Sequence, residues 1–297
     1  MAAKVIDKAA WTPVGAPEAL HEPLVMPAIL RAAMTSDRDV QARGEKIAVV
    51  IGGTSGIGFA TAQLLVQGGA HVTVAGRDRR KGERAIAALG ARARYVQADV
   101  ARSDQVAALI DAVVQRGGRL DWAVNAAALA DHLRPVPITE ITEDEWDHTL
   151  AADLKGMWLA MKHELAAMVS AGGGSIVNVS SVNGLSATPM AAAYCAAKHG
   201  LHGLSKTAAV EYAEQGIRVN VVCPGAHLTP MLQSMFERMS PGNPDQVAAL
   251  YRTRIPIGRL GDPVECAQAI TWLLSDAASY VTGAVLTVDG GLALKSA

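Results

Sequence analysis

Short apolar runs alternate with longer amphipathic segments along most of this chain. Seven runs are rich in β-branched and other apolar residues, and the first, Ile47 to Ile51, is apolar throughout. A run of this kind is typical of a strand buried on both faces of a parallel sheet. The expected strands cover residues 47–51, 71–75, 95–98, 120–125, 175–180, 217–222 and 285–288.

The segments between these strands carry apolar residues at helical spacing, and several of them end at glycines. The two longest expected helices cover residues 146–168 and 190–214. Strands and helices that alternate on this scale predict an α/β fold, in which right-handed crossovers place helices on both faces of one parallel seven-stranded sheet. In such a doubly wound sheet, ligands bind outside the carboxyl ends of the strands.

Residues 1–44 do not follow this pattern. They contain Trp11, four prolines between residues 13 and 27, and a short helix expected at 27–34. Prolines disfavour a long regular element, so this extension is either a disordered tail or an arm that packs on a neighbouring subunit. The expected domain covers residues 45–297 and includes a substrate lid at about 226–255.

A cluster of glycines follows the first strand and precedes a helix that continues to Gln67. Glycines leave backbone N–H groups bare, and the helix adds its positive N-terminus, so the turn can bind the pyrophosphate of a dinucleotide. The residues expected to hold it are Gly52, Thr54, Ser55, Gly56, Ile57 and Gly58.

Tyr194 and Lys198 lie four residues apart in an expected helix and therefore share one face. A neighbouring ammonium favours the phenolate and lowers the pKa of a tyrosine, which brings the hydroxyl towards acid–base chemistry near neutrality. This pair is common by chance on solvated helices. Ser181 directly follows the fifth strand, at the ligand edge of the sheet, where it is either a site residue or a turn and helix cap.

Together these motifs resemble the short-chain dehydrogenase/reductase family. The turn Gly52-x-x-x-Gly56-Ile57-Gly58 is similar to the family's glycine motif, and Ser181 precedes Tyr194 by 13 residues, as its catalytic serine does. The resemblance covers residues 46 to about 292. It implies a Rossmann fold and a Ser181–Tyr194–Lys198 active site that moves a hydride between a nicotinamide cofactor and a secondary alcohol or ketone.

The same resemblance implies further cofactor contacts. Besides Tyr194 and Lys198, the positions that match the family are Asp99, Val100, Asn125, Pro224, Gly225 and Thr229. Ala126 and Ala128 depart from the family's Asn-Asn-Ala-Gly stretch. Gly76 stands where NAD-preferring relatives carry Asp, and Arg77 supplies a cation for a 2′-phosphate, so NADP(H) is favoured over NAD(H). The alternative is that Arg77 is only a solvated loop residue.

Asp153 is a departure that concerns catalysis, because it occupies the place of the Asn that completes the family's catalytic tetrad. Its backbone carbonyl can keep the role of that Asn. Its carboxylate either raises the pKa of the Lys–Tyr pair or is neutralised by burial.

Two other groups of residues have competing interpretations. His199 and His202 are three residues apart, but no carboxylate or thiolate partner is evident, so no metal site is predicted. Met231, Met235, Phe236 and Met239 follow Thr229 at near-helical spacing. They are either ordinary core or an apolar lid over a small uncharged alcohol or carbonyl substrate.

Composition limits the partners. The net charge is −1 with scattered Lys and Arg, which indicates neither nucleic-acid nor membrane binding. Three cysteines without metal spacing, and no signal-peptide pattern, are typical of a cytoplasmic protein with reduced thiols. The family resemblance implies a homo-oligomer, a tetramer or dimer formed through the two long helices. The alternative to an enzyme is a catalytically silent nucleotide-binding sensor or scaffold with the same fold.

Overall fold

The computed structural model describes residues 45–129 and 135–295. The predicted N-terminal extension, with its short helix at 27–34, lies outside the described residues. No helix in the described ranges is long and apolar enough to cross a membrane.

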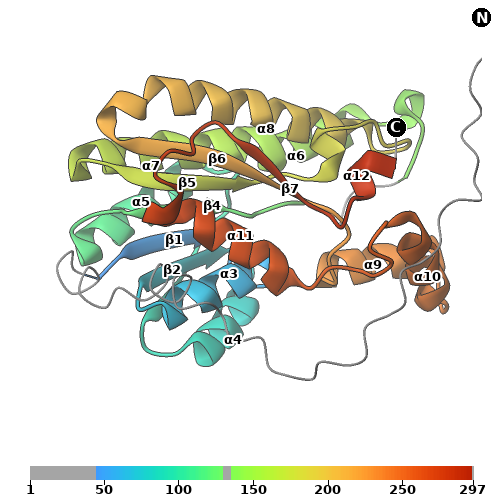
Figure 1. The fold of residues 1–297 in the computed structure, drawn as a ribbon, viewed down its shortest axis with the longest axis horizontal. Helices are drawn as coiled ribbons and strands as arrows, with labels where there is room; N and C mark the ends of the chain where they lie inside the picture. Colours follow the sequence, from blue (N-terminus) through green and yellow to red (C-terminus); the bar gives the residue numbers. More distant parts are fainter. Residues whose placement is uncertain (1–44, 130–134, 296–297) are drawn as a thin grey trace, which may run out of the picture. The chain divides into compact units, whose positions relative to one another are not determined.

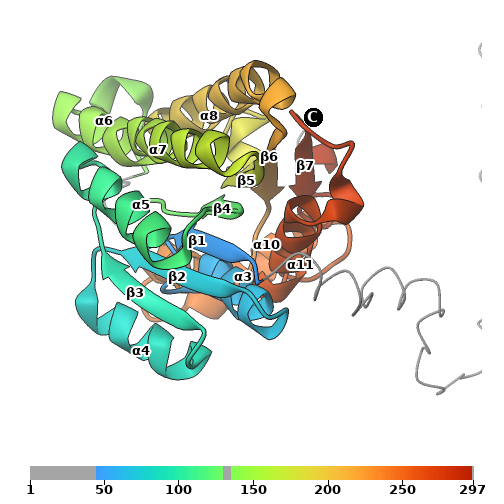
Figure 2. The same cartoon turned by 90° about the vertical axis from the view of Figure 1, so that its left-hand side faces the viewer.

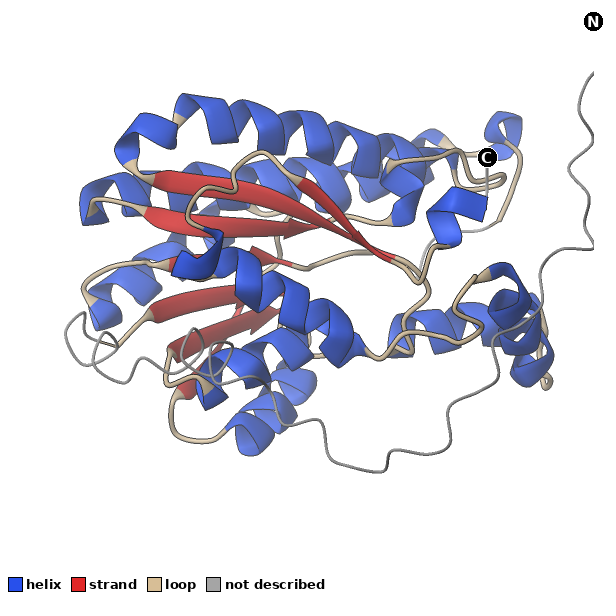
Figure 3. Cartoon of the chain, viewed as in Figure 1, coloured by secondary structure: helices blue, strands red, loops and turns tan. Residues whose placement is uncertain are grey.

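The described chain contains one parallel seven-stranded sheet, which confirms the predicted fold class (Figures 1 and 3). Its strand order is β3-β2-β1-β4-β5-β6-β7, so the order reverses between β1 and β4. The strands are β1 Ile47–Ile51, β2 His71–Gly76, β3 Ala93–Gln97, β4 Trp122–Asn125, β5 Gly174–Val179, β6 Ile217–Pro224 and β7 Val285–Val288. Each lies within three residues of its predicted bounds.

Helices cover both faces of the sheet (Figure 2). Helices α5, α7 and α8 pack on one face, and α3, α4 and α11 pack on the other. The helices are α3 Gly56–Gln67, α4 Arg79–Leu89, α5 Ser103–Gly117, α6 Glu143–Leu150, α7 Gly156–Ala171, α8 Ala192–Glu211, α9 Pro230–Met239, α10 Pro244–Arg254, α11 Pro263–Leu274 and α12 Leu292–Lys295. Short 3₁₀ segments lie at Ile138–Glu140, Val182–Gly184, Ala213–Gln215 and Asp276–Ala278.

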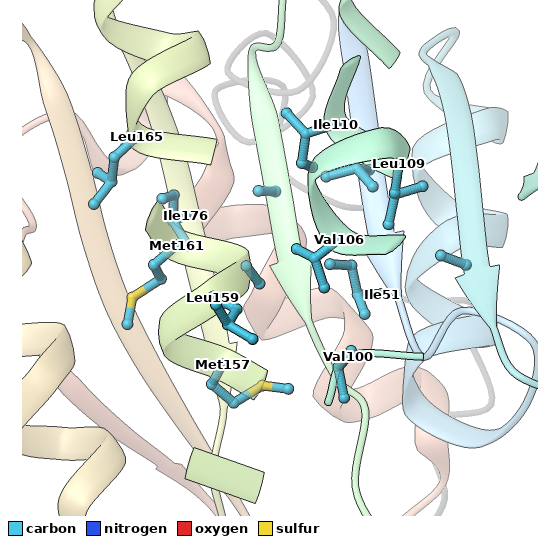
Figure 4. Packing of buried hydrophobic residues seen from close by; sticks show 14 of the residues in the cluster. Ile51, Val100, Val106, Leu109, Ile110, Met157, Leu159, Met161, Leu165 and Ile176 are labelled. Atoms are coloured by element: carbon cyan, nitrogen blue, oxygen red, sulfur yellow. The ribbon is translucent and has the colours of Figure 1, made fainter. Parts of the chain in front are cut away.

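Branched and long apolar side chains fill the layer between the sheet and α5 and α7 (Figure 4). Ile51 of β1 and Ile176 of β5 are buried beside Leu109 of α5 and Met157 of α7. Each such side chain contributes about 1.5–3 kcal/mol by leaving water. This packing fixes the carboxyl ends of the central strands relative to the helices that follow them.

The long helix predicted at 146–168 is wrong as a single regular element. Thr142 and Glu145 form a capping box that begins α6 at Glu143, and a π-helical turn, Ala151–Lys155, separates α6 from α7. A Cβ on Gly156 would lie 2.9 Å from Cγ2 of Val100, so the glycine lets the start of α7 approach the segment between β3 and α5 closely.

The helix predicted at 190–214 begins two residues later, at Ala192. Met190 has φ 63°, in the left-handed region that a helix cannot include. Tyr194 therefore lies in the first turn of α8.

A buried polar network joins four elements behind the site. Asn125 of β4 donates from Nδ2 to Glu164 Oε2 of α7 and to Asn178 Oδ1 of β5, both at 2.9 Å. Asn178 Nδ2 donates to Ser205 Oγ of α8 at 2.9 Å. Burial raises the pKa of Glu164 to about 7, against the opposing effect of the Asn125 hydrogen bond.

The Glu164 carboxyl makes the stability of the fold depend on pH. Because its folded pKa lies above the ordinary 4.5, the folded state binds more protons between pH 4.5 and about 7. Its contribution is present below pH 4.5 and is lost as the pH rises through 7, a change of about 3 kcal/mol. Glu164→Gln has no titrating group at this position. Between pH 4.5 and about 7, its free energy of unfolding, measured by urea unfolding, should therefore rise by about 3 kcal/mol relative to that of the wild type.

The exposed Asp144 of α6 offers a matched control, because Asp144→Asn also replaces a carboxylate with an amide. This variant should follow the wild-type pH profile. Parallel profiles for wild type and Glu164→Gln would contradict the assignment of a shifted carboxyl.

Candidate active site

The glycine turn after β1 is a cradle of bare backbone. Gly52 has φ +80°, and a Cβ on it would lie 2.5 Å from the backbone nitrogen of Ala127. A Cβ on Gly58 would collide with the carbonyl of Gly52. Gly56 has φ +55°, and its Cβ position is 3.2 Å from Cγ2 of Thr229. Side chains are therefore excluded where β1, β4 and the start of α9 meet.

The N-terminus of α3 opens onto this cradle. Ser55 is the N-cap residue of α3, but its side chain makes no capping hydrogen bond. The first helical N–H groups are then free of a side-chain cap, in a turn that also contains Thr54 and Ile57. Bare N–H groups and a helix dipole suit a dinucleotide pyrophosphate, so the residues present fit the predicted cofactor.

The end of β2 lies beside the same turn. A Cβ on Gly76 would lie 3.2 Å from the Thr54 side chain, so the position favours a small residue. The next residue, Arg77, has an exposed side chain, and its backbone carbonyl accepts a hydrogen bond from Gln97 Nε2 at 2.9 Å. Asp78 is engaged elsewhere, because its Oδ1 caps α4 by accepting from the backbone nitrogen of Lys81 at 3.0 Å. Arg77 is therefore an exposed residue that directly follows the end of β2, and the neighbouring Asp78 carboxylate is occupied by the α4 cap.

The remaining predicted cofactor positions surround the same strand ends. The side chain of Asp99 accepts from the backbone nitrogen of Ala101 at 3.0 Å, and Val100 is buried. Asn125 is fully buried and its amide belongs to the polar network, so only its backbone is left to contact a cofactor. The sequence-based expectation for Asn125 named the position and not the direction of its side chain, so it stays a prediction, now limited to the backbone of this residue.

Pro224 ends β6, and Gly225 and Thr229 follow it. Gly225 donates from its backbone nitrogen to the carbonyl of Val288 at 3.0 Å, which holds the turn against β7. Thr229 caps α9, since its Oγ1 accepts from the backbone nitrogen of Leu232 at 3.2 Å. The Thr229 methyl lies against Gly56, so the two sides of the cradle meet there.

Ser181, Tyr194 and Lys198 lie together at the carboxyl edge of the sheet. Ser181 lies two residues after the end of β5, is half-buried, and is hydrogen-bonded to Tyr194. Its Oγ also accepts from the backbone nitrogen of Asn183 at 3.1 Å, so the site residue and the turn cap are the same hydroxyl. Lys198 lies one turn after Tyr194, with Nζ 5.4 Å from the centroid of the phenol ring.

Lys198 is 1% exposed, and its ammonium has a buried counter-ion. Nζ lies 3.2 Å from Asp153 Oδ1 and donates to the carbonyl of Val179 at 3.4 Å. Asp153 lies in the π-helical turn and is fully buried, and its Oδ2 accepts from the backbone nitrogen of Leu129 at 3.3 Å.

The electrostatics of this cluster differ from the sequence-based expectation. Burial raises the pKa of Tyr194, Asp153 raises it further, and these effects outweigh the lowering by Lys198 and by the Ser181 hydrogen bond. Burial would lower the pKa of Lys198, but Asp153 and Tyr194 raise it, and its net direction is upward. Burial raises the pKa of Asp153, and Lys198 opposes that rise. Tyr194 is therefore the neutral phenol, and Lys198 the ammonium, near neutrality.

A second buried cluster lies directly behind Ser181, and the sequence carries no motif for it. His202 Nε2 is 2.8 Å from Ser180 Oγ and 3.4 Å from Cys223 Sγ. Burial lowers the pKa of His202 to about 4, so the ring that hydrogen-bonds the Ser180 hydroxyl is neutral. A Cβ on Gly184 would lie 2.8 Å from both His202 Nε2 and Ser180 Oγ. The cluster fixes the turn that carries Ser181 against α8.

The two histidines of α8 point to different surroundings. His202 is buried, whereas His199 is exposed and its Nδ1 lies 2.9 Å from the carbonyl of Cys195. Across the described ranges, no three His, Cys, Asp or Glu side chains gather as a metal-ligand set.

Helices α9 and α10 form the segment predicted as a lid, beyond the arrowheads of the strands in Figure 1. Phe236 is buried and packs with Met235 into a small core between the two helices. Met231 and Met239 are exposed. The four residues therefore do not form one face. Met235 and Phe236 belong to the core between the two helices, whereas Met231 and Met239 are exposed apolar residues.

Comparison with known proteins agrees with this geometry. A family model described as enoyl-(acyl carrier protein) reductase matches residues 51–293. A cis-4-hydroxycyclohexanecarboxylate dehydrogenase of Sinomonas cyclohexanicum is 44% identical over 255 residues, covering 84% of this chain and 98% of the relative. A 2,5-dichloro-2,5-cyclohexadiene-1,4-diol dehydrogenase of Sphingobium indicum is 42% identical over 248 residues, covering 83% and 96%. The crystal structure of an actinorhodin polyketide ketoreductase variant with NADPH has a TM-score of 0.78 at 34% identity, covering 84% and 97%.

Proposed function

The chain belongs to the short-chain dehydrogenase/reductase family, and from that premise we propose that it is an NADP(H)-preferring carbonyl reductase of small cyclic ketones. The coarser statement, a nicotinamide-dependent oxidoreductase acting on CH–OH groups, follows from the family and its named relatives. The observation that carries the proposal is the contact of Ser181, Tyr194 and Lys198 beside the glycine cradle. We include a cytoplasmic location in the proposal, supported by three free cysteines.

An uncharged ring is the substrate class that fits this chain best. Both curated relatives are named for compounds with a six-membered carbon ring. The segment between Ser181 and Tyr194 exposes Leu185 and Met190, and the segment after β6 exposes Leu228 and Met231. These side chains follow two neighbouring strands, β5 and β6, at the edge that carries the site. An apolar surface there favours a small hydrophobic alcohol or ketone over a charged one.

The chemistry follows from the protonation states. A nicotinamide cofactor supplies or accepts the hydride when bound, and the glycine turn, Thr229 and Lys198 would hold it. Tyr194, held as the neutral phenol, donates a proton to the oxygen of the carbonyl as the alcohol forms. Ser181 donates a hydrogen bond to the same oxygen and stabilises the charge that develops there. In the opposite direction Tyr194 must first lose its proton.

The cofactor preference rests on Arg77. Its side chain is exposed and directly follows Gly76, a position that supplies no carboxylate to hold a ribose hydroxyl. A guanidinium can bind a phosphate through two parallel hydrogen bonds. The related ketoreductase structure, which contains NADPH, is consistent with this preference.

Reduction of cyclic ketones should depend on the hydroxyl of Tyr194. In a panel of cyclic ketones with NADPH and NADH, Tyr194→Phe should lower kcat by about 10²–10⁴-fold, because it removes the proton donor while the ring still packs. Cofactor binding, followed by nicotinamide fluorescence, should survive this change. Lys198→Met should weaken turnover and cofactor binding together. A Tyr194→Phe enzyme with undiminished kcat would refute the mechanism, whereas cofactor binding without turnover of any ketone would favour a nucleotide sensor.

Discrimination between the cofactors should depend on Arg77. Arg77→Ala should raise the dissociation constant for NADPH by on the order of tenfold or more, since a charge-assisted contact is lost, and leave that for NADH nearly unchanged. Arg80→Ala removes another exposed arginine from the next turn and should change neither constant. A wild-type protein that binds NADPH no more tightly than NADH would overturn the preference.

We further propose a dimer or tetramer formed through α7 and α8. Trp158 and Val169 on α7 and Val210 on α8 are exposed apolar residues, and Val210 is 81% exposed. A charge at such a position disrupts close helix packing, so Val210→Asp should dissociate the assembly in light scattering at micromolar concentration. Ile138→Asp, on an exposed 3₁₀ segment, should not. A monomeric wild type would exclude this interface.

A further inference from the structure

Two opposite charges are buried next to each other in the candidate site. Asp153 and Lys198 are 0% and 1% exposed, and Oδ1 and Nζ are 3.2 Å apart. Removing two charges from water is costly unless each is compensated. In such a pair each charge stabilises the other: Lys198 opposes the rise that burial causes in the pKa of Asp153, and Asp153 raises the pKa of Lys198.

The backbone holds Asp153 in position for this contact. Its π-helical turn, Ala151–Lys155, lies between two α-helices, a place where such turns commonly serve a site. Leu129, just after β4, donates its backbone N–H to Asp153 Oδ2 at 3.3 Å. The carboxylate is thus held from two sides, by an N–H and by an ammonium.

The charges of Asp153 and Lys198 together determine whether the phenol of Tyr194 loses its proton easily. One buried cation balances one buried anion. With Asp153 ionised and Lys198 charged, the cluster is neutral when Tyr194 is protonated, and losing the phenol proton would leave an uncompensated buried negative charge. With a neutral residue at position 153, the same ammonium would have no counter-ion and would stabilise the phenolate.

The other groups that face the pair do not change this count. Tyr194 is faced by Ser181 and Cys195 in addition to Lys198 and Asp153. Lys198 is also faced by the thiol of Cys223, whose pKa burial raises to about 11, so it is neutral. His202, one turn further along α8, is neutral as well.

We propose that Asp153 is a positioning residue that holds Lys198 as its ion-pair partner and thereby keeps Tyr194 in its proton-donating form, setting the site for ketone reduction at neutral pH. Alcohol oxidation then requires alkaline conditions, since it needs the phenolate. The proposal deepens the proposed function and rests on it for the reaction, but the ionisation of Tyr194 can be measured without turnover.

The first experiment titrates Tyr194 in the cofactor-free protein. The tyrosinate absorbance of Tyr194→Phe, subtracted from that of the wild type, isolates one phenol among the five tyrosines. Tyr194 should remain protonated at about pH 9 in the wild type, since an unperturbed tyrosine titrates near 10. When both proteins also carry Asp153→Asn, the difference between their absorbances should show Tyr194 titrating with a midpoint lower by about one pH unit or more.

The second experiment measures turnover against pH. For alcohol oxidation, the acid limb of kcat/KM should move to lower pH in Asp153→Asn by the same amount, so that oxidation at neutral pH rises by about tenfold per unit. Glu164→Gln is the control, because it removes another buried carboxyl, on α7, that contacts none of Tyr194, Lys198 and Asp153. In this variant the acid limb of kcat/KM should stay at the wild-type pH. Circular dichroism checks the fold of each variant, and Asp153→Ser is the second neutral substitution if Asp153→Asn does not fold.

The outcomes separate the two proposals. A wild-type Tyr194 that ionises well below pH 9, or equal midpoints with Asp and with a neutral residue at position 153, would overturn the role of Asp153. A folded protein that reduces no ketone would remove the proposed function, while the titration of Tyr194 would still decide what Asp153 does.

Discussion

Parallel pairing of the strands is the constraint on which the site depends. In a parallel sheet every strand ends at the same edge, so residues far apart in sequence leave their strands side by side. Here the reversal of strand order between β1 and β4 places the glycine cradle next to the turns that follow β4 and β5. Ser181, Tyr194 and Lys198 depend on the same edge, because Ser181 follows the end of β5 and the next α-helix, α8, begins there. A strand that ran antiparallel in the middle of this sheet would move one of these groups to the opposite edge.

Polar groups in the core define this edge more narrowly than apolar packing does. The network of Asn125, Glu164, Asn178 and Ser205 joins two strands to two helices by directional bonds. The contact of Ser180 with His202 fixes the next turn along the chain. Apolar side chains tolerate small shifts, whereas a buried hydrogen bond is lost when its partners separate. Hydrogen bonds between neighbouring residues therefore help to position Ser181 and Tyr194, in addition to the bonds that Ser181 makes itself.

The sequence alone predicts the sheet well, because strands buried on both faces leave continuous apolar runs. It also identifies the glycine turn and the Ser181, Tyr194 and Lys198 motif, whose spacing the chain itself displays. It does not predict the π-helical turn at Ala151–Lys155, since the residues of that turn are ordinary helix formers and the distortion depends on packing against neighbouring elements. The sequence-based prediction of a lowered pKa for Tyr194 is wrong for a related reason. A nearby lysine is visible in sequence, but burial and the contact with Asp153 are properties of the folded chain.

The two ends of the α9–α10 segment are tied to each other. Leu228 donates from its backbone nitrogen to the carbonyl of Gly261 at 2.8 Å, and Gly261 donates to the carbonyl of Ala226 at 2.9 Å. Between these bonds the segment has its own small core, built on Phe236, Val247 and Ala248. A loop whose ends are already joined adds little closure entropy when its length changes. The sequence and length of this segment can therefore change while the ends of the strands beside it keep their geometry.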